Sequence, residues 1–136
     1  MVDTLVRILG PDDEPAFRAF LAPRASSSMF MLSNSSAAGF VDEGKRLQAT
    51  YAGAFADGRL VGVAAHCWNG MLLVQAPAEL TTPETVGELV RHAVAASGRA
   101  ISGFSGTADQ VQVARRAFTL PPATLEEVEG LYPLEL

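Results

Sequence analysis

The sequence has little cysteine, histidine and charge, and each scarcity excludes a class of protein. Cys67 is the only cysteine among 136 residues, so the chain has neither an internal disulfide nor a zinc site built from cysteines. His66 and His92 are the only histidines, which are too few for a histidine-rich metal site, and we expect no metal. Charged residues make up only 18% and the net charge is −5, which argues against a nucleic-acid or membrane partner.

The apolar content, by contrast, is high enough for one folded domain. Apolar residues make up 49% of the chain, and we predict a domain over residues 1–122 followed by an acidic, leucine-containing tail or inter-domain connector over residues 123–136. The N-terminal residues show no cationic stretch before an apolar run, and a lone thiol fits a reducing compartment. We therefore predict a cytoplasmic protein.

Turn residues predict the strands. We expect strands over residues 2–9, 51–56, 60–68, 71–75 and 100–104. Asp57-Gly58 and Asn69-Gly70 are pairs typical of type I′ turns, so the three middle strands should form an antiparallel meander. The uncharged run 60–78 is accordingly interpreted as two strands and not as a membrane span.

Capping residues and apolar spacing predict the helices. Thr81 with Glu84, and Thr107 with Gln110, have capping-box spacing, while Pro83 equally suits a first helical position. The expected helices run from residue 12 to Pro23, from 25 to a Gly39 end between capping serines, from 81 or 82 to Gly98, and from 107 to Pro121. The elements predict an α/β (α+β) fold with a mixed, mostly antiparallel central sheet flanked by helices.

Four stretches of the sequence, in this order, carry a resemblance. They are YAGAF at 51–55, RLVGV at 59–63, LLVQAP at 72–77 and SGFSGTADQV at 102–111. With the order of elements they resemble the N-terminal half of bacterial two-domain members of the GNAT superfamily of acetyl-CoA-dependent N-acetyltransferases, over roughly residues 12–134. The resemblance implies a GNAT-like fold, acetyl-CoA as the family's cofactor, and a GNAT catalytic domain or a second copy as partner. Because the cofactor-binding half comes second in that family, the sequence resembles a truncated, first-half domain.

The loop at residues 75–83 departs from the family's cofactor motif, usually R/Q-x-x-G-x-G/A. Gln75 matches its first position, but no glycine follows before residue 83. Pro77 and Pro83 lack the N–H donors that a diphosphate requires, and Glu79 and Glu84 add negative charge. We therefore expect this segment not to bind the diphosphate of coenzyme A.

The family's general-acid tyrosine also lacks a counterpart on the last helix. One alignment register places Phe118 at that position and another places Arg115. Phenylalanine has no proton to give, and a guanidinium stays charged. The resemblance therefore implies a transferase family, whereas these residues predict a segment that does not catalyse by itself.

Six residues remain as weak candidates for a site, each with a structural alternative. His66 is either a general base or a hydrogen-bonded core residue, and on a strand it should share a face with Trp68 but not with Cys67. The turn at Ser105, Gly106 and Thr107 is either an anion site for the cofactor or a tight turn with a cap. Asn34 and Trp68 are substrate candidates, or else a local cap and packing area.

Three functions follow from these alternatives. The first is a non-catalytic GNAT-like domain that serves packing and substrate-side roles for an acetyltransferase domain. The second is an active acetyl-CoA-dependent N-acyltransferase with a divergent cofactor site. The third is a small-ligand-binding regulatory module, with Met29, Met31, Asn34 and Trp68 as candidate lining.

Overall fold

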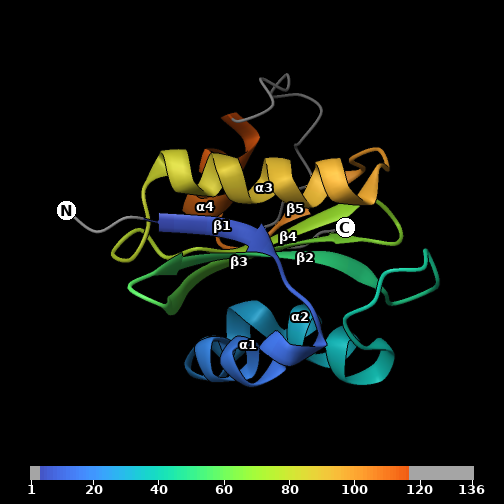
Figure 1. Ribbon diagram of the computed structural model, residues 1–136. Coiled ribbons are helices and arrows are strands. Elements are labelled where there is room, and N and C mark those ends of the chain that lie inside the picture. The colour runs from blue at the N-terminus through green and yellow to red at the C-terminus, as the bar shows by residue number, and fades with distance from the viewer. Residues whose placement is uncertain (1–3, 117–136) are drawn as a thin grey trace.

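The computed structural model describes residues 4–116, which form a five-stranded sheet with helices on both faces (Figure 1). The strands are β1 (Thr4–Ile8), β2 (Ala49–Ala56), β3 (Arg59–Cys67), β4 (Met71–Gln75) and β5 (Gly103–Ser105). The helices are α1 (Glu14–Leu21), α2 (Ala25–Ala38), α3 (Pro83–Ser97) and α4 (Ala108–Arg116), with 3-10 turns at Pro11–Asp13 and Ala22–Arg24. The predicted mixed, mostly antiparallel α+β fold is confirmed. No helix in this range is both long and apolar enough to cross a membrane.

The strands lie in the sheet in chain order, β1-β2-β3-β4-β5. The first four pair antiparallel, and the meander from β2 to β4 is confirmed. β5 pairs parallel with β4 over three residues, because α3 carries the chain back across the sheet between them. β5 is shorter than the strand predicted over 100–104 and begins later.

The two hairpin turns differ, although both were expected to be type I′. Asp57 and Gly58 have φ of 52° and 76°, as a type I′ turn requires. At the second hairpin only Gly70 has a positive φ, of 92°, and its N–H donates to the Cys67 carbonyl at 2.8 Å. Gly70 is therefore the fourth residue of a turn that begins at Cys67, and the predicted turn type is wrong while the hairpin is right.

Three predictions about the caps of the helices are wrong. Thr82 caps α3 by accepting a hydrogen bond from the Thr85 N–H at 3.2 Å, and Pro83 is the first helical residue, so the Thr81 capping box is wrong. The Thr107 box is wrong as well, because the Gln110 side chain points into the protein. No serine caps α2: the 3-10 turn after α1 runs directly into it and its N-cap is Arg24.

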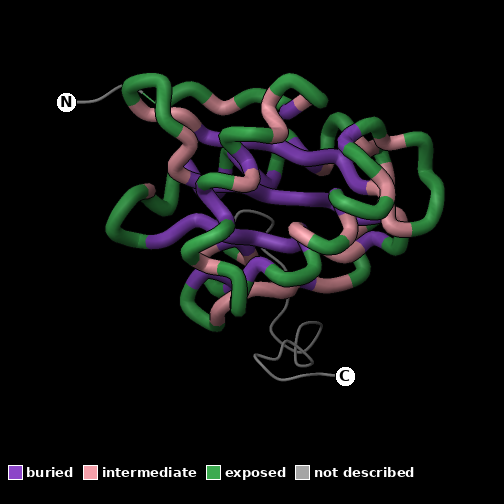
Figure 2. Tube along the Cα trace, turned by 90° about the horizontal axis from the view of Figure 1, so that it is seen from below, coloured by how far each residue is buried: buried purple, intermediate pink, exposed green. Residues whose placement is uncertain are grey.

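Two apolar clusters lie on opposite faces of the sheet. Beneath α3 and α4, buried side chains of the strands meet those of the helices; the helical members are Val86, Leu89, Val90, Ala93, Val111 and Ala114. Against α1 and α2, Phe17 packs edge-on against Phe40 and Tyr51, with ring centroids 4.7 and 5.3 Å away. Figure 2 shows the buried positions running along the central strands between these layers. The tail predicted over 123–136 and Phe118 lie outside the described residues.

Candidate functional site

A small cavity lies where β4 ends and α3 and α4 begin. Its volume is about 170 Å³. The residues that line it are Ala76, Ala78, Thr81, Thr82, Pro83, Val86, Asp109, Gln110 and Val113. Most of these side chains are apolar or small, and Asp109 is the one ionisable residue among them. The cavity therefore offers an apolar wall with one carboxylate, and no cation among the described residues that line it.

Two glutamines fill the space beside this cavity, just past the last β4–β5 pair. Gln75 is 2% exposed and donates from Nε2 to the Oγ atoms of Ser27 and Ser28, at 2.6 and 2.9 Å. Gln110 donates from Nε2 to Gln75 Oε1 at 3.0 Å, and its Oε1 accepts the N–H of Ala76. The first backbone donor beyond β4 is thus occupied by the protein's own side chain. The same bonds join the start of α2 and the start of α4 through the end of β4.

The start of α3 offers few donors toward the cavity. Pro83 has no N–H, and Thr82 uses its hydroxyl oxygen to cap Thr85. Thr81 Oγ1 donates to the carbonyls of Ala76 and Pro77, at 3.2 and 2.9 Å. The hydroxyl groups of this loop are therefore already hydrogen-bonded within the protein. An anion in the cavity would find few free donors there.

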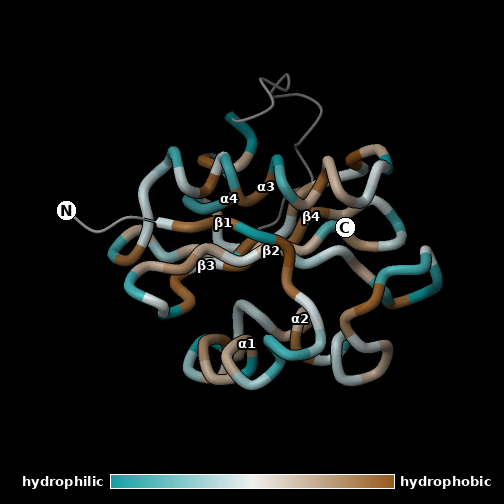
Figure 3. Tube along the Cα trace, viewed as in Figure 1, coloured by the Kyte–Doolittle hydropathy of each residue, from teal (hydrophilic) through white to brown (hydrophobic). Residues whose placement is uncertain are grey.

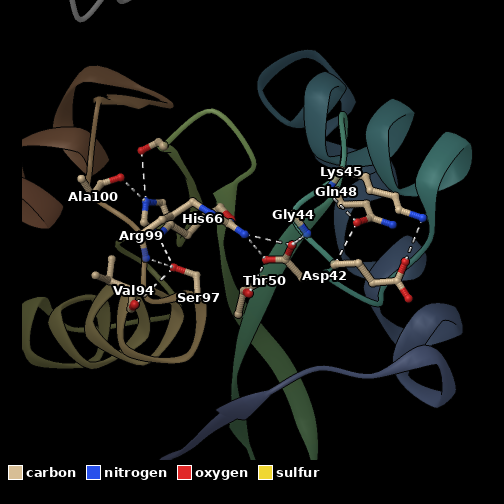
Figure 4. Close-up of polar contacts among 12 residues, drawn as sticks. Asp42, Gly44, Lys45, Gln48, Thr50, His66, Val94, Ser97, Arg99 and Ala100 are labelled. Atoms are coloured by element: carbon tan, nitrogen blue, oxygen red, sulfur yellow. Dashed lines mark hydrogen bonds and ion pairs between the residues drawn. The ribbon is translucent and has the colours of Figure 1, made fainter.

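His66 lies on the α3 side of the sheet, fully buried (Figure 4). Its Nδ1 is 2.6 Å from Ser97 Oγ, and its Nε2 is 3.1 Å from the carbonyl oxygens of both Gly70 and Ala100. Two carbonyls around Nε2 assign the proton to that nitrogen. Burial lowers the pKa of His66, so the ring is neutral near pH 7. His66 therefore links the β3–β4 turn to the end of α3 through hydrogen bonds that are buried from solvent.

An ion pair lies beside His66 and joins the loop after α2 to the end of α3. Arg99 Nη2 is 2.9 Å from Asp42 Oδ2, and Arg99 Nη1 donates to the His66 carbonyl at 2.8 Å (Figure 4). Burial opposes the charge on Asp42, but hydrogen bonds from Thr50 and Gly44, together with Arg99, outweigh it and lower the pKa of that carboxyl. The charges of Arg99 and Asp42 neutralise each other, so the cluster has a structural role: it holds the loop after α2 against the end of α3.

The face prediction for the end of β3 is wrong at one residue. Cys67 is 3% exposed and belongs to the cluster against α1 and α2, opposite His66, as expected. Trp68 packs on the same cluster as Cys67, because β3 ends at Cys67 and the alternation of sides stops there. Burial raises the pKa of the Cys67 thiol to about 12, so it stays protonated and unreactive in the folded protein.

The candidate turn at residues 105–107 lies between β5 and α4 and outside the cavity lining. Gly106 has φ of 153°, and a Cβ there would lie 2.8 Å from the Val74 carbonyl oxygen, so the close approach requires glycine. Thr107 Oγ1 donates to Asp109 Oδ1 at 2.7 Å. The turn thus positions the first turn of α4, which does contribute to the cavity.

The candidates on α2 and at the hairpin do not converge on a pocket. Met31 is 2% exposed and, with the half-buried Trp68, belongs to the cluster against α1 and α2. Met29 is 60% exposed, on the outside of the same helix, and Asn34 is half-buried. None of the four lines the cavity.

Sequence reasoning named Gln75 only as a motif remnant and missed its pairing with Gln110. It also did not predict the ion pair between Asp42 and Arg99. Within residues 4–116 no three His, Cys, Asp or Glu residues are grouped closely enough to hold a metal. A scan against protein-family models and searches of curated proteins and of solved structures found no match to this chain.

Proposed function

We propose that the chain is a GNAT-like domain without catalytic activity of its own, which packs beside an acetyltransferase domain and shapes its substrate side. The order of elements supports the proposal: a strand, two helices, an antiparallel meander, a helix, a strand parallel to β4 and a last helix. This is the order that the GNAT resemblance of the sequence implies.

The junction between β4 and α3 is the observation that carries the non-catalytic assignment. A cofactor diphosphate needs free N–H groups and positive charge. Here the Ala76 N–H is bound to Gln110, and Pro77 and Pro83 have no N–H to offer. The exposed acids Glu79 and Glu84 lie in the same segment. The junction therefore opposes the ligand through both its donors and its charge.

Arg115 supports the same assignment at the end of α4. In one register with the family it stands where the general acid would stand, and a guanidinium group is too weak an acid for that role. At these two positions, the groups that the family uses to hold the cofactor and to protonate its thiolate are missing, which supports a domain that does not catalyse by itself.

Calorimetry with acetyl-CoA tests the proposal on the full chain. We expect no saturable heat up to millimolar cofactor, with an active GNAT enzyme as positive control. Saturable micromolar binding would overturn it. If binding appears, thiol release over a panel of amines tests the divergent enzyme, and Thr107→Val is the variant of choice because it avoids the clash that a side chain at Gly106 meets.

The cavity favours a second candidate function, a small-ligand module. Cavities of about 150 Å³ hold molecules of the size of benzene, and this one is about 170 Å³. An occupant would be a small, mainly apolar molecule without phosphate. Native mass spectrometry should then find a retained molecule that Val113→Phe, which fills the cavity, displaces. This function is contradicted if the wild type carries no mass beyond that of its own chain, or if the variant retains the same additional mass as the wild type.

A further inference from the structure

The cavity between β4, α3 and α4 is surrounded by charge of one sign. Residues 76–90 and 100–114, which contain all of its lining residues, include four acids and no Lys, Arg or His. The acids are Glu79, Glu84, Glu88 and Asp109, and all of them are exposed. Within residues 4–116 none of them forms an ion pair. The described surroundings of the cavity are therefore negatively charged.

The starts of α3 and α4 do not reverse this sign. A helix N-terminus carries about half a positive charge, so the two starts together contribute about one. Glu84 lies in the first turn of α3 and Asp109 in the first turn of α4, and each brings a full negative charge to that end of its helix. With Glu79 in the loop before α3, the carboxylates outweigh the two helix dipoles.

The polar atoms at the cavity can accept hydrogen bonds more readily than donate them. Thr107 donates its hydroxyl to Asp109 Oδ1 at 2.7 Å, and within residues 4–116 no donor is bound to Oδ2. The Thr81 hydroxyl already donates to the carbonyls of Ala76 and Pro77, so its oxygen retains only the capacity to accept. A ligand group that only donates therefore suits this site better than one that has to accept.

The remainder of the lining is apolar. Pro83, Val86 and Val113 supply its largest apolar side chains. Figure 3 shows the corresponding division on α3, whose outward turns are teal while the turns toward the sheet include brown residues. Val86 is buried and Asp109 is exposed. The cavity thus combines a buried apolar wall with a carboxylate near solvent.

We propose that this cavity binds a small organic cation, an inference that rests on the small-ligand function proposed for it. The apolar body of the ligand lies against Val86 and Val113, and its ammonium group donates to Asp109 Oδ2. An ammonium has three donors and no acceptor, and its charge is opposite to that of the surroundings. The features that oppose a diphosphate are the ones that select this ligand. The step is binding alone, and no covalent bond forms or breaks.

The size of the cavity and the exposure of Asp109 set the expected affinity. A cavity of about 170 Å³ holds a single ring. A ligand of about eight heavy atoms should bind with a dissociation constant in the millimolar range. Because water screens an exposed carboxylate, the charge of the ligand should improve its affinity by only about 5-fold.

NMR titrations of the amide resonances of the full chain test the proposal with probes of one shape and different charge. The probes are benzylamine as the cation, benzyl alcohol as the neutral molecule and benzoate as the anion. Benzylamine should shift the Val86 and Val113 amides in a saturable way and bind about 5-fold more tightly than benzyl alcohol, and benzoate should bind more weakly than both. Asp109→Asn keeps the shape and an acceptor for Thr107, so it should lower the affinity for benzylamine to that for benzyl alcohol. The same spectra show that each variant is folded.

Glu88→Gln is the matched control. It also removes one exposed carboxylate, but Glu88 does not line the cavity, so the preference for benzylamine should stay within about 2-fold of the wild type. The proposal is overturned if benzyl alcohol or benzoate binds as tightly as benzylamine, if Asp109→Asn keeps the preference, or if Glu88→Gln loses it. Equal binding of the probes would leave the small-ligand function standing without the cation, whereas binding of none of them would overturn both.

Discussion

Two of the helices that cover the sheet, α3 above and α2 below, differ in what they bury and in what they expose. The buried side chains of α3 are mostly aliphatic, whereas α2 buries Met31 together with Ser28 and Ser35. α3 exposes Glu84, Glu88, Arg91 and His92, whereas α2 exposes serine, alanine, Met29 and Phe30. The apolar core therefore holds α3 through several side chains, but its buried contact with α2 is mainly through Met31. The outer side of α3 is charged, whereas residues 25–41, which include α2, contain no charged side chain. The exposed sides of α3 and α2 therefore differ in charge as well as in the residues behind them.

The largest expected effect comes from replacing phenylalanine by alanine at a buried and at an exposed position of the helical layer below the sheet. Phe17 is fully buried and packs on Phe40 and Tyr51, so Phe17→Ala should lower the free energy of unfolding by about 3–5 kcal/mol. Phe30→Ala, at an exposed position, should change it by less than about 0.5 kcal/mol. Urea unfolding at a concentration where the chain is monomeric measures both. Equal losses would mean that Phe30 is part of the core and not of a surface.

The second prediction breaks the link between the two layers. Arg99→Met leaves the Asp42 carboxylate without its cation, and should cost about 3 kcal/mol because that side chain is only 10% exposed. Lys45→Met removes the exposed pair with Glu43 and should cost less than about 1 kcal/mol.

The same pair makes a prediction about acid. The pKa of Asp42 is lowered in the folded protein, so its stabilisation is present above the unfolded value of about 3.9 and is lost as pH falls through the folded value. Wild-type stability should therefore drop below about pH 4, and Arg99→Met should flatten that drop. An unchanged acid profile in the variant would contradict the link.

The next prediction concerns His66 of β3, which contacts Ser97 at the end of α3. Burial lowers its pKa, so the unfolded chain binds its proton first and stability falls as pH decreases below about 6.5. The slope should reach up to about 1.4 kcal/mol per pH unit. His92→Gln, on the exposed side of α3, should retain this slope. A wild type equally stable at pH 7 and pH 5 would be inconsistent with a buried neutral ring.

The smallest expected effect compares the two helix starts. Thr82→Ala removes the cap of α3 and should cost about 1 kcal/mol. Ser26→Ala, in the first turn of α2 where no side chain caps, should cost nothing or stabilise by up to about 0.5 kcal/mol. Shifts of the denaturation midpoint measure both, and a larger loss at Ser26 would contradict the assigned caps.

Local signals in the sequence predicted the fold better than they predicted the candidate site. Asp57-Gly58 and Gly98 act on their own neighbours, so they located a hairpin and a helix end. Gln75 and Gln110 stand 35 residues apart, and Asp42 and Arg99 stand 57 apart. No local pattern indicates which distant polar groups meet, so Gln110 was interpreted as part of a cap and the Asp42–Arg99 pair was not predicted. The cavity likewise depends on how three elements pack.

The buried thiol of Cys67 allows local unfolding of the sheet to be measured by thiol labelling. A maleimide or disulfide reagent reacts with thiolate, and the folded protein offers neither the charge nor the access, since burial raises the pKa of this group to about 12. Because the chain has no second cysteine, the whole labelling signal arises from excursions that expose the end of β3. The labelling rate then reports how often the sheet comes apart there.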